Sequence, residues 1–492
     1  MAASSSFLPA CRCFGLCLIL VAGPATPATS ESEALHAINR LSFGPAPGDV
    51  ARVMTMGIDA YVDEQLHPER LAEPEALTRR LAALELAGAS QRELVRRFRS
   101  TAGKNKDDKD EAKAERQALH RQLAEEAATA RLLPALQSPR QLQEVMVDFW
   151  SNHFNVYQGK GLDHALIASY EREAIRPFVL GRFRDLLGAT AHHPAMLFYL
   201  DNWLSTAPGF QPAKEGKGKG SGLNENYARE LMELHTLGVD GGYSQQDVTE
   251  LARMLTGWTF DPRSGDGRSL FVFAARRHDD GSKQWLGHTV LPRGQNEGEW
   301  ALDVLAEHPA TARHIAFELA QYFVSDTPPA ALVERLAKRF RESGGDIRAV
   351  LGGLFASPEF RDPAIYGTKF KHPYRYLLSA LRAAEQPVED VRPLLGLMRQ
   401  QGMPLFGCQT PDGYKNTEVA WLNPDAMTRR VAFATAMGSG HLPLSENMAV
   451  DALRLQSTLG PALSSKTRAA VERADPRLRS ALILGCPDFM RY

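Results

Sequence analysis

Segments with helical periodicity follow one another along almost the whole chain, and they constrain the possible folds more than any other feature of the sequence. Residues 30–66 contain two amphipathic stretches separated by the turn-forming GPAPG at 44–48. Residues 104–131 are rich in Lys, Glu and Ala, a composition typical of a helix exposed to solvent. Further amphipathic segments follow Trp300. The sequence therefore predicts a mainly α, multi-helix globular protein.

One segment breaks this pattern. Residues Leu270–Val290 alternate apolar and polar side chains around a central Asp-Asp-Gly turn, which predicts one small β-hairpin. The chain has 492 residues, too many for one ordinary domain. We expect two lobes: an N-terminal helical lobe at 29–298, which carries the hairpin and the polar helix motifs described below, and a C-terminal helical lobe at 299–492.

The first thirty residues differ in composition from the rest. An apolar run, CFGLCLILVAG, follows Arg12 and precedes the small-residue stretch GPATPATS. This order is typical of a secretory signal peptide, so residues 1–28 are expected to be cleaved off near Ala28. The alternative, a buried N-terminal helix, is disfavoured because no periodic polar face accompanies the run. The run is too short to span a bilayer. The sequence therefore predicts an exported protein, periplasmic or extracellular, without a transmembrane anchor in the mature chain.

The net charge argues against one class of partner, and the cysteine content bears on disulfides and metal binding. The formal net charge of −1 gives no basic surface for nucleic acid, and we expect no nucleic-acid partner. After removal of the leader only Cys408 and Cys486 remain, and an exported protein is in a compartment that permits disulfides. A disulfide between them is a reasonable hypothesis. Metal ligation by either cysteine is less favoured, since neither has a closely spaced Cys or His.

The first polar helix motif is NENYARELMELHTLG at 224–238. At about 100° per residue, Asn226, Arg229, Glu230 and Glu233 share one stripe of a helix, whereas His235 points away from it. The stripe has two interpretations. It is either a surface row of ion pairs or a carboxylate cluster that faces a cleft and holds a metal or shares a proton.

A second motif, LQEVMVDFWSNHFNV at 142–156, carries Glu144, Asp148 and Asn152 at four-residue spacing, followed by His153. Two packed helices would bring five metal-ligating side chains together: Glu144, Asp148, His153, Glu230 and Glu233. Bundle proteins hold divalent and di-iron centres with such sets, although neither helix here shows a Glu-x-x-His pair. A structural network of buried ion pairs would use the same residue types, so both interpretations stay open.

The segment RHDDGSK contributes His278, Asp279 and Lys283 around the predicted hairpin turn. A His-Asp pair at a turn is usually solvated or caps the backbone. The alternative is an acid/base pair that serves the cleft.

The glycine-marked turn VDGGYSQQD at 239–247 has some features of a calcium-binding loop. Asp240 and Asp247 fit such a loop, but Thr236 and Gly238 would be poor ligands at its first positions. The simpler interpretation is that Gly238 ends one helix and that Ser244 with Asp247 forms a capping box for the next.

Several motifs together resemble an uncharacterised bacterial family, domain of unknown function 1800. They include NRLSFGPAPGD, DFWSNHFNV, HPAMLFYLDN, NENYARELMELHTLGVDGGYSQQDVTELARMLTGWTF, HDDGSKQWLG, SGGDIRAVLGGLFASPEF and PDGYKNTEVAWLNP, and the resemblance runs from about His36 to the last residues. The insertion KEGKGKGSG lengthens the family's link between YLDN and NENYARE.

The resemblance implies export, a helical architecture and a second exported protein, similar to the alkaline phosphatase and sulfatase superfamily, as a frequent partner. It carries no established activity. The polar motifs of the family fall on His153, Asn224, Glu225, Arg229, Glu230, Glu233, His278, Asp279 and Lys283.

Two hypotheses follow. The first is a metal-assisted enzyme in a helical cleft, with Glu144, Asp148, His153, Glu230 and Glu233 around a divalent ion. Arg229 would orient the carboxylates or bind an anionic substrate, and His278 would act as an acid or base. The candidate catalytic residues are His153, Arg229, Glu230, Glu233, His278, Asp279 and Lys283. The second hypothesis is a non-catalytic partner or scaffold for another exported protein.

Overall fold

A computed structural model describes residues 1–2, 29–100, 109–211, 222–263, 269–442, 444 and 448–492. Over these ranges the protein is mainly α, with 25 α-helices and two small two-stranded antiparallel sheets. The predicted fold class is confirmed. Nearly all of the predicted signal peptide, and all but the last residue of the KEGKGKGSG insertion, lie outside the described residues.

The chain enters the fold through a capped helix. The Ser30 hydroxyl accepts a hydrogen bond from the Glu33 backbone N–H, and the Glu33 carboxylate accepts one from the Ser30 N–H, which fixes the start of α1. The sequence predicted two helices in residues 30–66, but Gly57, at φ +85°, divides the second one. The first three helices are α1 (Glu31–Leu41), α2 (Asp49–Met56) and α3 (Ile58–Leu66).

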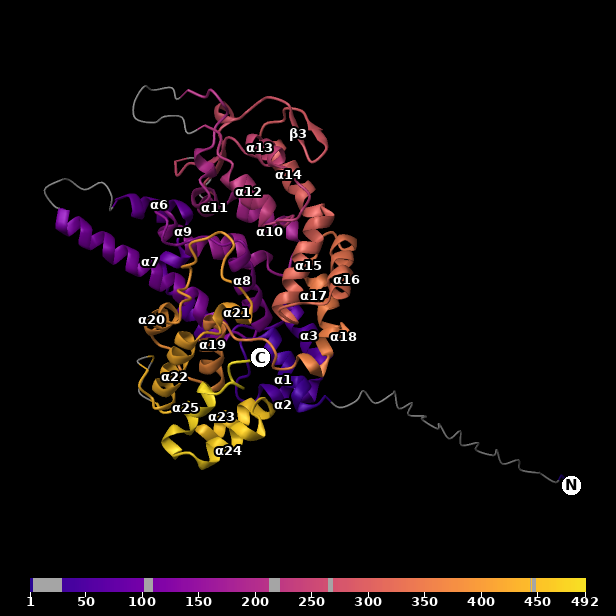
Figure 1. Ribbon diagram of the computed structural model, residues 1–492, viewed down its shortest axis with the longest axis vertical. Coiled ribbons are helices and arrows are strands. Elements are labelled where there is room, and N and C mark those ends of the chain that lie inside the picture. The colour runs from indigo at the N-terminus through magenta and orange to yellow at the C-terminus, as the bar shows by residue number, and fades with distance from the viewer. Residues whose placement is uncertain (3–28, 101–108, 212–221, 264–268, 443, 445–447) are drawn as a thin grey trace.

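The rest of the first half is helical too. A long helix, α7, projects to one side of the molecule and packs against α8 and α9 (Figure 1). The Ser-Pro pair at 138–139 lies just before α8, and the Ser138 hydroxyl accepts a hydrogen bond from the backbone N–H of Arg140. The helices are α4 (Glu75–Ala82), α5 (Glu85–Gly88), α6 (Gln91–Ser100), α7 (Lys109–Gln137), α8 (Gln141–His153), α9 (Asp163–Tyr170), α10 (Phe183–His192), α11 (Pro194–Tyr199), α12 (Asn226–Glu233) and α13 (Gln245–Met254).

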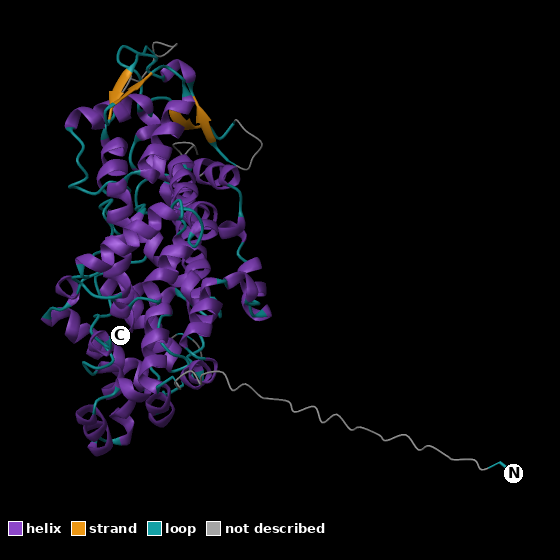
Figure 2. Ribbon diagram, turned by 90° about the vertical axis from the view of Figure 1, so that its right-hand side faces the viewer, coloured by secondary structure: helices purple, strands orange, loops and turns teal. Residues whose placement is uncertain are grey.

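The single predicted hairpin at Leu270–Val290 is wrong. β1 (Trp258–Phe260) pairs with β2 (Phe271–Phe273), and β3 (Lys283–Trp285) pairs with β4 (His288–Val290), at one end of the molecule (Figure 2).

The position of the turn explains why the predicted hairpin does not form. The Asp-Asp-Gly segment does not reverse the strand, because Asp279 is held on α13 by two hydrogen bonds from Arg253, at 2.9 and 3.0 Å. The tight turn falls at Leu286-Gly287, where both residues have positive φ, at 47° and 79°.

Helices return after β4. In Figure 1, α15, α16 and α17 pack together along one side, and α22 to α25 form the end opposite the strands. The helices are α14 (Gln295–Glu307), α15 (Pro309–Phe323), α16 (Ala330–Glu342), α17 (Ile347–Phe355), α18 (Pro358–Arg361), α19 (Pro373–Ala383), α20 (Arg392–Gln400), α21 (Glu418–Trp421), α22 (Pro424–Gly438), α23 (Ala452–Leu459), α24 (Ser465–Arg473) and α25 (Arg479–Gly485).

One hydrophobic core runs through both halves of the chain. Its buried side chains extend from Ala34 to Met490, and α8, in the middle, is buried along most of its length. N-terminal and C-terminal helices pack directly: α3 against α17, and α7 against α19. The lobe boundary at residue 298 stays a prediction.

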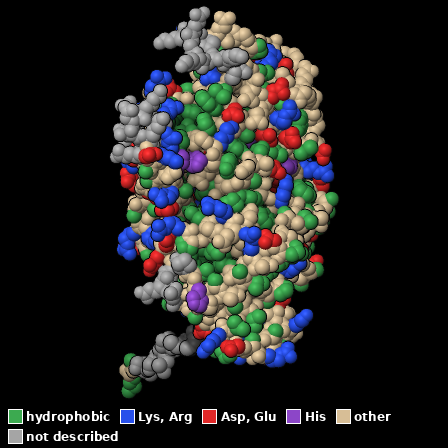
Figure 3. All heavy atoms as spheres, turned by 60° about the vertical axis from the view of Figure 1, so that its left-hand side comes forward, with side chains coloured by type: hydrophobic (Ala, Val, Ile, Leu, Met, Phe, Trp, Pro, Cys, Tyr) green, Lys and Arg blue, Asp and Glu red, His purple; other side chains and the backbone are tan. Residues whose placement is uncertain are grey.

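The surface carries both signs of charge. On the face drawn in Figure 3, Lys and Arg side chains lie interspersed with Asp and Glu. Within the described ranges, no helix combines the length and the apolar character that a membrane crossing requires.

The structure does not support the hypothesis of a disulfide, since Cys408 and Cys486 are both free thiols. Each belongs to a different local arrangement. The Cys408 Sγ lies 3.7 Å from the Thr410 carbonyl oxygen, in the segment between α20 and α21. The Cys486 Sγ follows α25 and accepts a hydrogen bond from the Phe489 N–H at 3.3 Å.

Candidate functional site

A cavity of about 250 Å³ lies between α8 and α15. α8 contributes Asp148 and Asn152, four residues apart on one helical face, together with His153 at its last position. α15 contributes His314 and Glu318, also four residues apart. The cavity therefore joins two helices that are more than 150 residues apart in sequence. Other lining residues are Glu233, at the end of α12, and His372, Asp412 and Lys415, from segments between helices.

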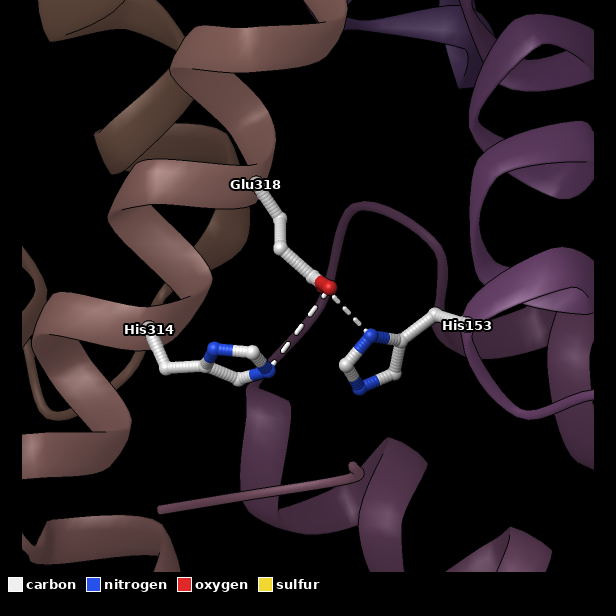
Figure 4. Close-up of side chains that lie close together, drawn as sticks. All are labelled: His153, His314 and Glu318. Atoms are coloured by element: carbon white, nitrogen blue, oxygen red, sulfur yellow. Dashed lines mark hydrogen bonds and ion pairs between the residues drawn. The ribbon is translucent and has the colours of Figure 1, made fainter. Parts of the chain in front are cut away.

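Two imidazole rings face one carboxylate in this cavity. Figure 4 shows His314 and Glu318 on one helix, with His153 approaching from the opposite side. The His153 Nδ1 lies 2.6 Å from the Glu318 Oε2, and the His314 Nε2 lies 3.6 Å from the Glu318 Oε1. One ligand atom from each of the three residues lies within 4.8 Å of the other two, close enough for all three to hold one metal ion.

The backbone orients both rings. The His153 Nε2 lies 3.2 Å from the His235 carbonyl oxygen, and the His314 Nε2 lies 3.2 Å from the Leu234 carbonyl oxygen. A carbonyl accepts only, so both Nε2 atoms carry a proton and donate it. To bind a metal, the His314 Nε2 would give up its proton and its bond to Leu234. The His153 Nε2 keeps its role as a donor. This leaves the His153 Nδ1 facing the Glu318 carboxylate either with a second proton or with a lone pair. A metal-binding histidine commonly donates its other N–H to a carbonyl in this way.

Electrostatics favour an ionised Glu318. Burial alone would raise the pKa of its carboxyl, but the charges of His153 and His314, the hydrogen bond from His153 and the charge of Lys415 outweigh burial and hold that pKa below its usual range. The buried neighbour His235 behaves oppositely. Burial, reinforced by His153 and His314, lowers its pKa well below the usual value and keeps it neutral.

Asp148 reaches the cavity wall but is held by other groups. Its Oδ1 pairs with the buried Arg131 at 3.0 Å, and its Oδ2 accepts a hydrogen bond from the Tyr322 hydroxyl at 3.2 Å. The His372 Nε2 lies 3.7 Å from the same Oδ2. Burial lowers the pKa of His372 to about 4, although Asp148 opposes this effect, so the ring is neutral at pH 7. Asp148 is thus fixed in place by three partners.

Glu144 does not reach the cavity, which corrects the predicted convergence of five ligands. It pairs with Arg176, and Arg176 and Arg131 both pair with Glu171 on the same side of α8. Burial raises the pKa of Glu144, and Arg176 only partly offsets this. The stripe on α8 is therefore largely the buried ion-pair network that the sequence left as an alternative.

The two acids of α12 are separated. Glu233, at the end of the helix, lines the cavity, whereas Glu230 lines a different, open pocket beside Tyr199 and Lys160. Burial and the nearby Glu233 raise the pKa of Glu230.

The remaining residues of this motif serve local structure. Arg229 contacts the carboxylate of Glu225 at 3.4 Å and donates to the side-chain oxygen of Gln245 at 2.8 Å. The Asn224 side-chain oxygen accepts from the Asn226 N–H at 2.9 Å. The structure thus brings Asp148, His153 and Glu233 to the cavity, but not Glu144, Arg229 or Glu230.

The three hairpin residues lie in a separate cluster. His278 and Lys283 have fully buried side chains and share Glu297: the His278 Nε2 lies 3.2 Å from its Oε1, and the Lys283 Nζ lies 2.6 Å from its Oε2. Asp279 pairs with Arg253, which holds the pKa of that carboxyl low despite its burial. This cluster ties the hairpins to α13 and α14.

The turn after α12 takes the capping form. Ser244 and Asp247 make the reciprocal hydrogen bonds of a capping box. α12 ends at Glu233, so Gly238, at φ +83°, lies in the turn that follows and does not end the helix, which corrects that part of the prediction. The Asp247 carboxylate also accepts from the backbone N–H of Leu286 at 2.7 Å, so it is occupied by backbone donors.

Sequence reasoning missed His314 and Glu318. In PATARHIAFELAQYF they are a histidine and a glutamate four residues apart, which places both on one helical face. That spacing was the available signal, but the segment otherwise has the pattern of an ordinary amphipathic helix.

A comparison with protein families gives one match. The model of the family described as "Protein of unknown function (DUF1800)" matches residues 36–491. No curated protein and no solved structure matches the chain.

Proposed function

Because the chain belongs to the DUF1800 family, which has no described activity, we propose a function from its own side chains: it is a metal-assisted enzyme that holds a divalent ion with His153, His314 and Glu318. The observation that carries the proposal is the convergence of two imidazole nitrogens on one carboxylate at the wall of a cavity.

The donor set fits this role. Two histidines and one carboxylate hold zinc and non-haem iron in enzymes and leave a coordination position open to substrate. The His235 carbonyl, which accepts from the His153 Nε2–H, fixes the ring so that Nδ1 faces Glu318. The backbone of the segment that follows α12 thus orients the ligands of α8 and α15.

We propose hydrolysis as the reaction class. A divalent ion in such a site lowers the pKa of a bound water and polarises a carbonyl or phosphoryl oxygen. Glu233 lines the same cavity and would accept the proton that a hydrolytic step releases. Asp148, fixed by Arg131 and Tyr322, would orient the polar part of the substrate.

Export is part of the proposal. The apolar leader in residues 1–28 supports it. The test is N-terminal sequencing of the protein recovered from a periplasmic extract. A mature N-terminus near Thr29 supports export, and an intact Met1 in the cytoplasmic fraction contradicts it.

Metal content tests the site. Residues 29–492 are purified without chelator, and bound metal is measured by elemental mass spectrometry. We expect near one divalent ion per chain, and at least a tenfold loss in Glu318→Gln and His314→Ala. The matched controls are Glu307→Gln and His288→Ala, two exposed residues outside the cavity. A folded wild-type protein that remains metal-free after incubation with Zn²⁺, Mn²⁺ or Fe²⁺ would contradict the proposal.

The surface favours a second candidate function, that of a partner for another exported protein. Large exposed hydrophobic side chains are concentrated in the last part of the chain: Val419, Leu422, Val431, Met448, Leu453, Leu478 and Leu482. Co-expression with a phosphatase- or sulfatase-like exported protein, followed by light scattering, tests this role. A complex that forms with the wild type but not with Val419→Ser/Leu453→Ser supports it, and two separate species contradict it.

A further inference from the structure

A second, smaller pocket of about 50 Å³ adjoins the cavity. Asp148, Asn152, Met403 and Tyr414 line both spaces, so the two meet at these side chains. We call this smaller space the side pocket. It opens beside the cavity that contains His153, His314 and Glu318.

The side pocket is largely apolar. Val156, Ile167, Leu405 and Phe406 contribute to its wall. Three charged groups reach it and belong to one ion-pair network: Arg131 pairs with Glu171 at 2.6 Å and with Asp148 at 3.0 Å. An aliphatic group would lose water there without leaving a charge unpaired.

The segment between α20 and α21, residues 401–417, roofs both spaces, and we call it the covering loop. Figure 1 draws it as an orange segment in front of α8. Asn152 makes two hydrogen bonds with the Tyr414 backbone, at 2.9 and 2.7 Å, and the Asn155 side chain donates to the Cys408 and Thr410 carbonyls, at 3.1 and 2.8 Å. The end of α8 that carries His153 therefore also fixes the covering loop.

The backbone of the covering loop is strained at Phe406. Its φ of +53° is a left-handed conformation that a bulky side chain rarely adopts. The Gln158 N–H, which donates to the Phe406 carbonyl at 3.0 Å, helps to hold it there. Strain of this kind is concentrated at ligand sites, where the surrounding structure maintains it.

We propose that the substrate carries a short aliphatic group next to its metal-binding polar group, and that the side pocket receives the aliphatic group. The proposal rests on the proposed function, since the metal site fixes the polar end. One enclosed water needs about 10–15 Å³, so the side pocket has room for only a few carbon atoms. Leu405 and Phe406 would set the permitted length.

Straight-chain hydroxamates test the length preference, because their two oxygens bind a metal and the alkyl chain varies alone. Zinc-loaded protein is titrated by calorimetry with acetohydroxamate, butyrohydroxamate and octanohydroxamate. We expect the affinity to rise about three- to fourfold for each CH₂ that enters the side pocket and to stop rising once the pocket is full.

Variants of the covering loop test whether the alkyl chain binds in the side pocket. Leu405→Trp fills the side pocket and removes the gain with length, and Leu405→Ala enlarges it and moves the optimum to a longer chain. Leu422→Trp, at an exposed position just after α21, is the matched control and leaves the length preference unchanged. Metal content and circular dichroism are measured for each variant. If Leu405→Trp does not fold, the shift in Leu405→Ala decides.

The outcomes separate the two proposals. Equal affinity for all three hydroxamates at full metal content overturns the side-pocket inference and leaves the metal site standing. An affinity that rises with length but does not respond to either Leu405 variant also overturns it, because the chain then binds elsewhere. A wild-type protein without metal overturns the proposed function, and the inference with it.

Discussion

The His153 Nδ1 lies 2.6 Å from the Glu318 Oε2, and this contact links α8 to α15 across 165 residues of sequence. It explains why a motif in the first half of the chain and a helix in the second half form one site. The contact is also the strongest local reason for Glu318 to stay ionised.

The Glu318 contact predicts a specific pH dependence of stability. Its pKa in the folded protein lies below the usual value for glutamate, so the stabilisation is fully present above that usual value, about 4.5, and is lost as the pH falls through the lowered pKa. With chelator present, the difference in unfolding free energy between the wild type and Glu318→Gln should therefore shrink as the pH falls below about 4.5. Urea denaturation followed by circular dichroism measures it. A difference that stays constant as the pH falls below this value would show that the charge of Glu318 does not contribute.

Local patterns made much of the fold predictable. The capping box of Ser244 and Asp247 involves residues close in sequence, so spacing alone identifies it. The hairpin prediction failed because the turn was decided by a contact outside the segment. Arg253 holds Asp279 on α13, and the strand reverses at Leu286-Gly287 instead.

The candidate site was only partly predictable for the same reason. Asp148, His153 and Glu233 stood out in dense polar motifs and do line the cavity. Glu144 shares its helical stripe, but Arg176 binds it, and nothing in the stripe distinguishes a carboxylate that meets an arginine from one that faces a cavity. The position of Glu318 opposite His153 depends on the packing of α15 against α8, which sequence periodicity does not specify.

The buried network around Arg131 should be costly to break. Arg131 pairs with Asp148 and Glu171 at 3.0 and 2.6 Å, so Arg131→Met leaves the buried Asp148 without a cation and Glu171 with Arg176 alone. We expect a loss of about 3–5 kcal/mol in unfolding free energy, measured by urea denaturation.

Two further variants serve as controls for the loss of stability in Arg131→Met. Adding Asp148→Asn and Glu171→Gln to Arg131→Met should recover part of the loss, because the charges are then removed together. Arg79→Met breaks an exposed pair with Glu75 and should cost less than about 1 kcal/mol. If Arg131→Met costs no more than Arg79→Met, the network does not stabilise the fold.

Tyr492 should stabilise the fold through its ring and not through its hydroxyl. The ring centre lies 4.9 Å from the Arg40 Cζ and 4.3 Å from the Arg375 Cζ, whereas its buried hydroxyl has no hydrogen-bond partner among the described residues. Tyr492→Phe keeps both cation–π contacts and should change the unfolding free energy by less than about 1 kcal/mol. Tyr492→Ala leaves a cavity and should cost about 3–5 kcal/mol. Thermal and urea unfolding measure both. A large loss in Tyr492→Phe would show that the hydroxyl is bonded after all.

Asn152 should hold the covering loop closed. Its side chain accepts a hydrogen bond from the Tyr414 N–H at 2.7 Å and donates to the Tyr414 carbonyl at 2.9 Å, so Asn152→Ala releases both polar groups of that residue at once. We expect the backbone amides of residues 409–415 to exchange hydrogen at least tenfold faster, and trypsin to cleave after the exposed Lys415 sooner, while the core helices keep their protection. Asn296→Ala, at an exposed position on α14, is the matched control and should change neither rate.

Exchange measured by mass spectrometry distinguishes the outcomes. If the loop amides are as protected in Asn152→Ala as in the wild type, the bonds from Asn155 to the Cys408 and Thr410 carbonyls hold the loop without Asn152. If protection is lost through α8 as well, Asn152 stabilises the helix that carries His153, and its role is not confined to the loop.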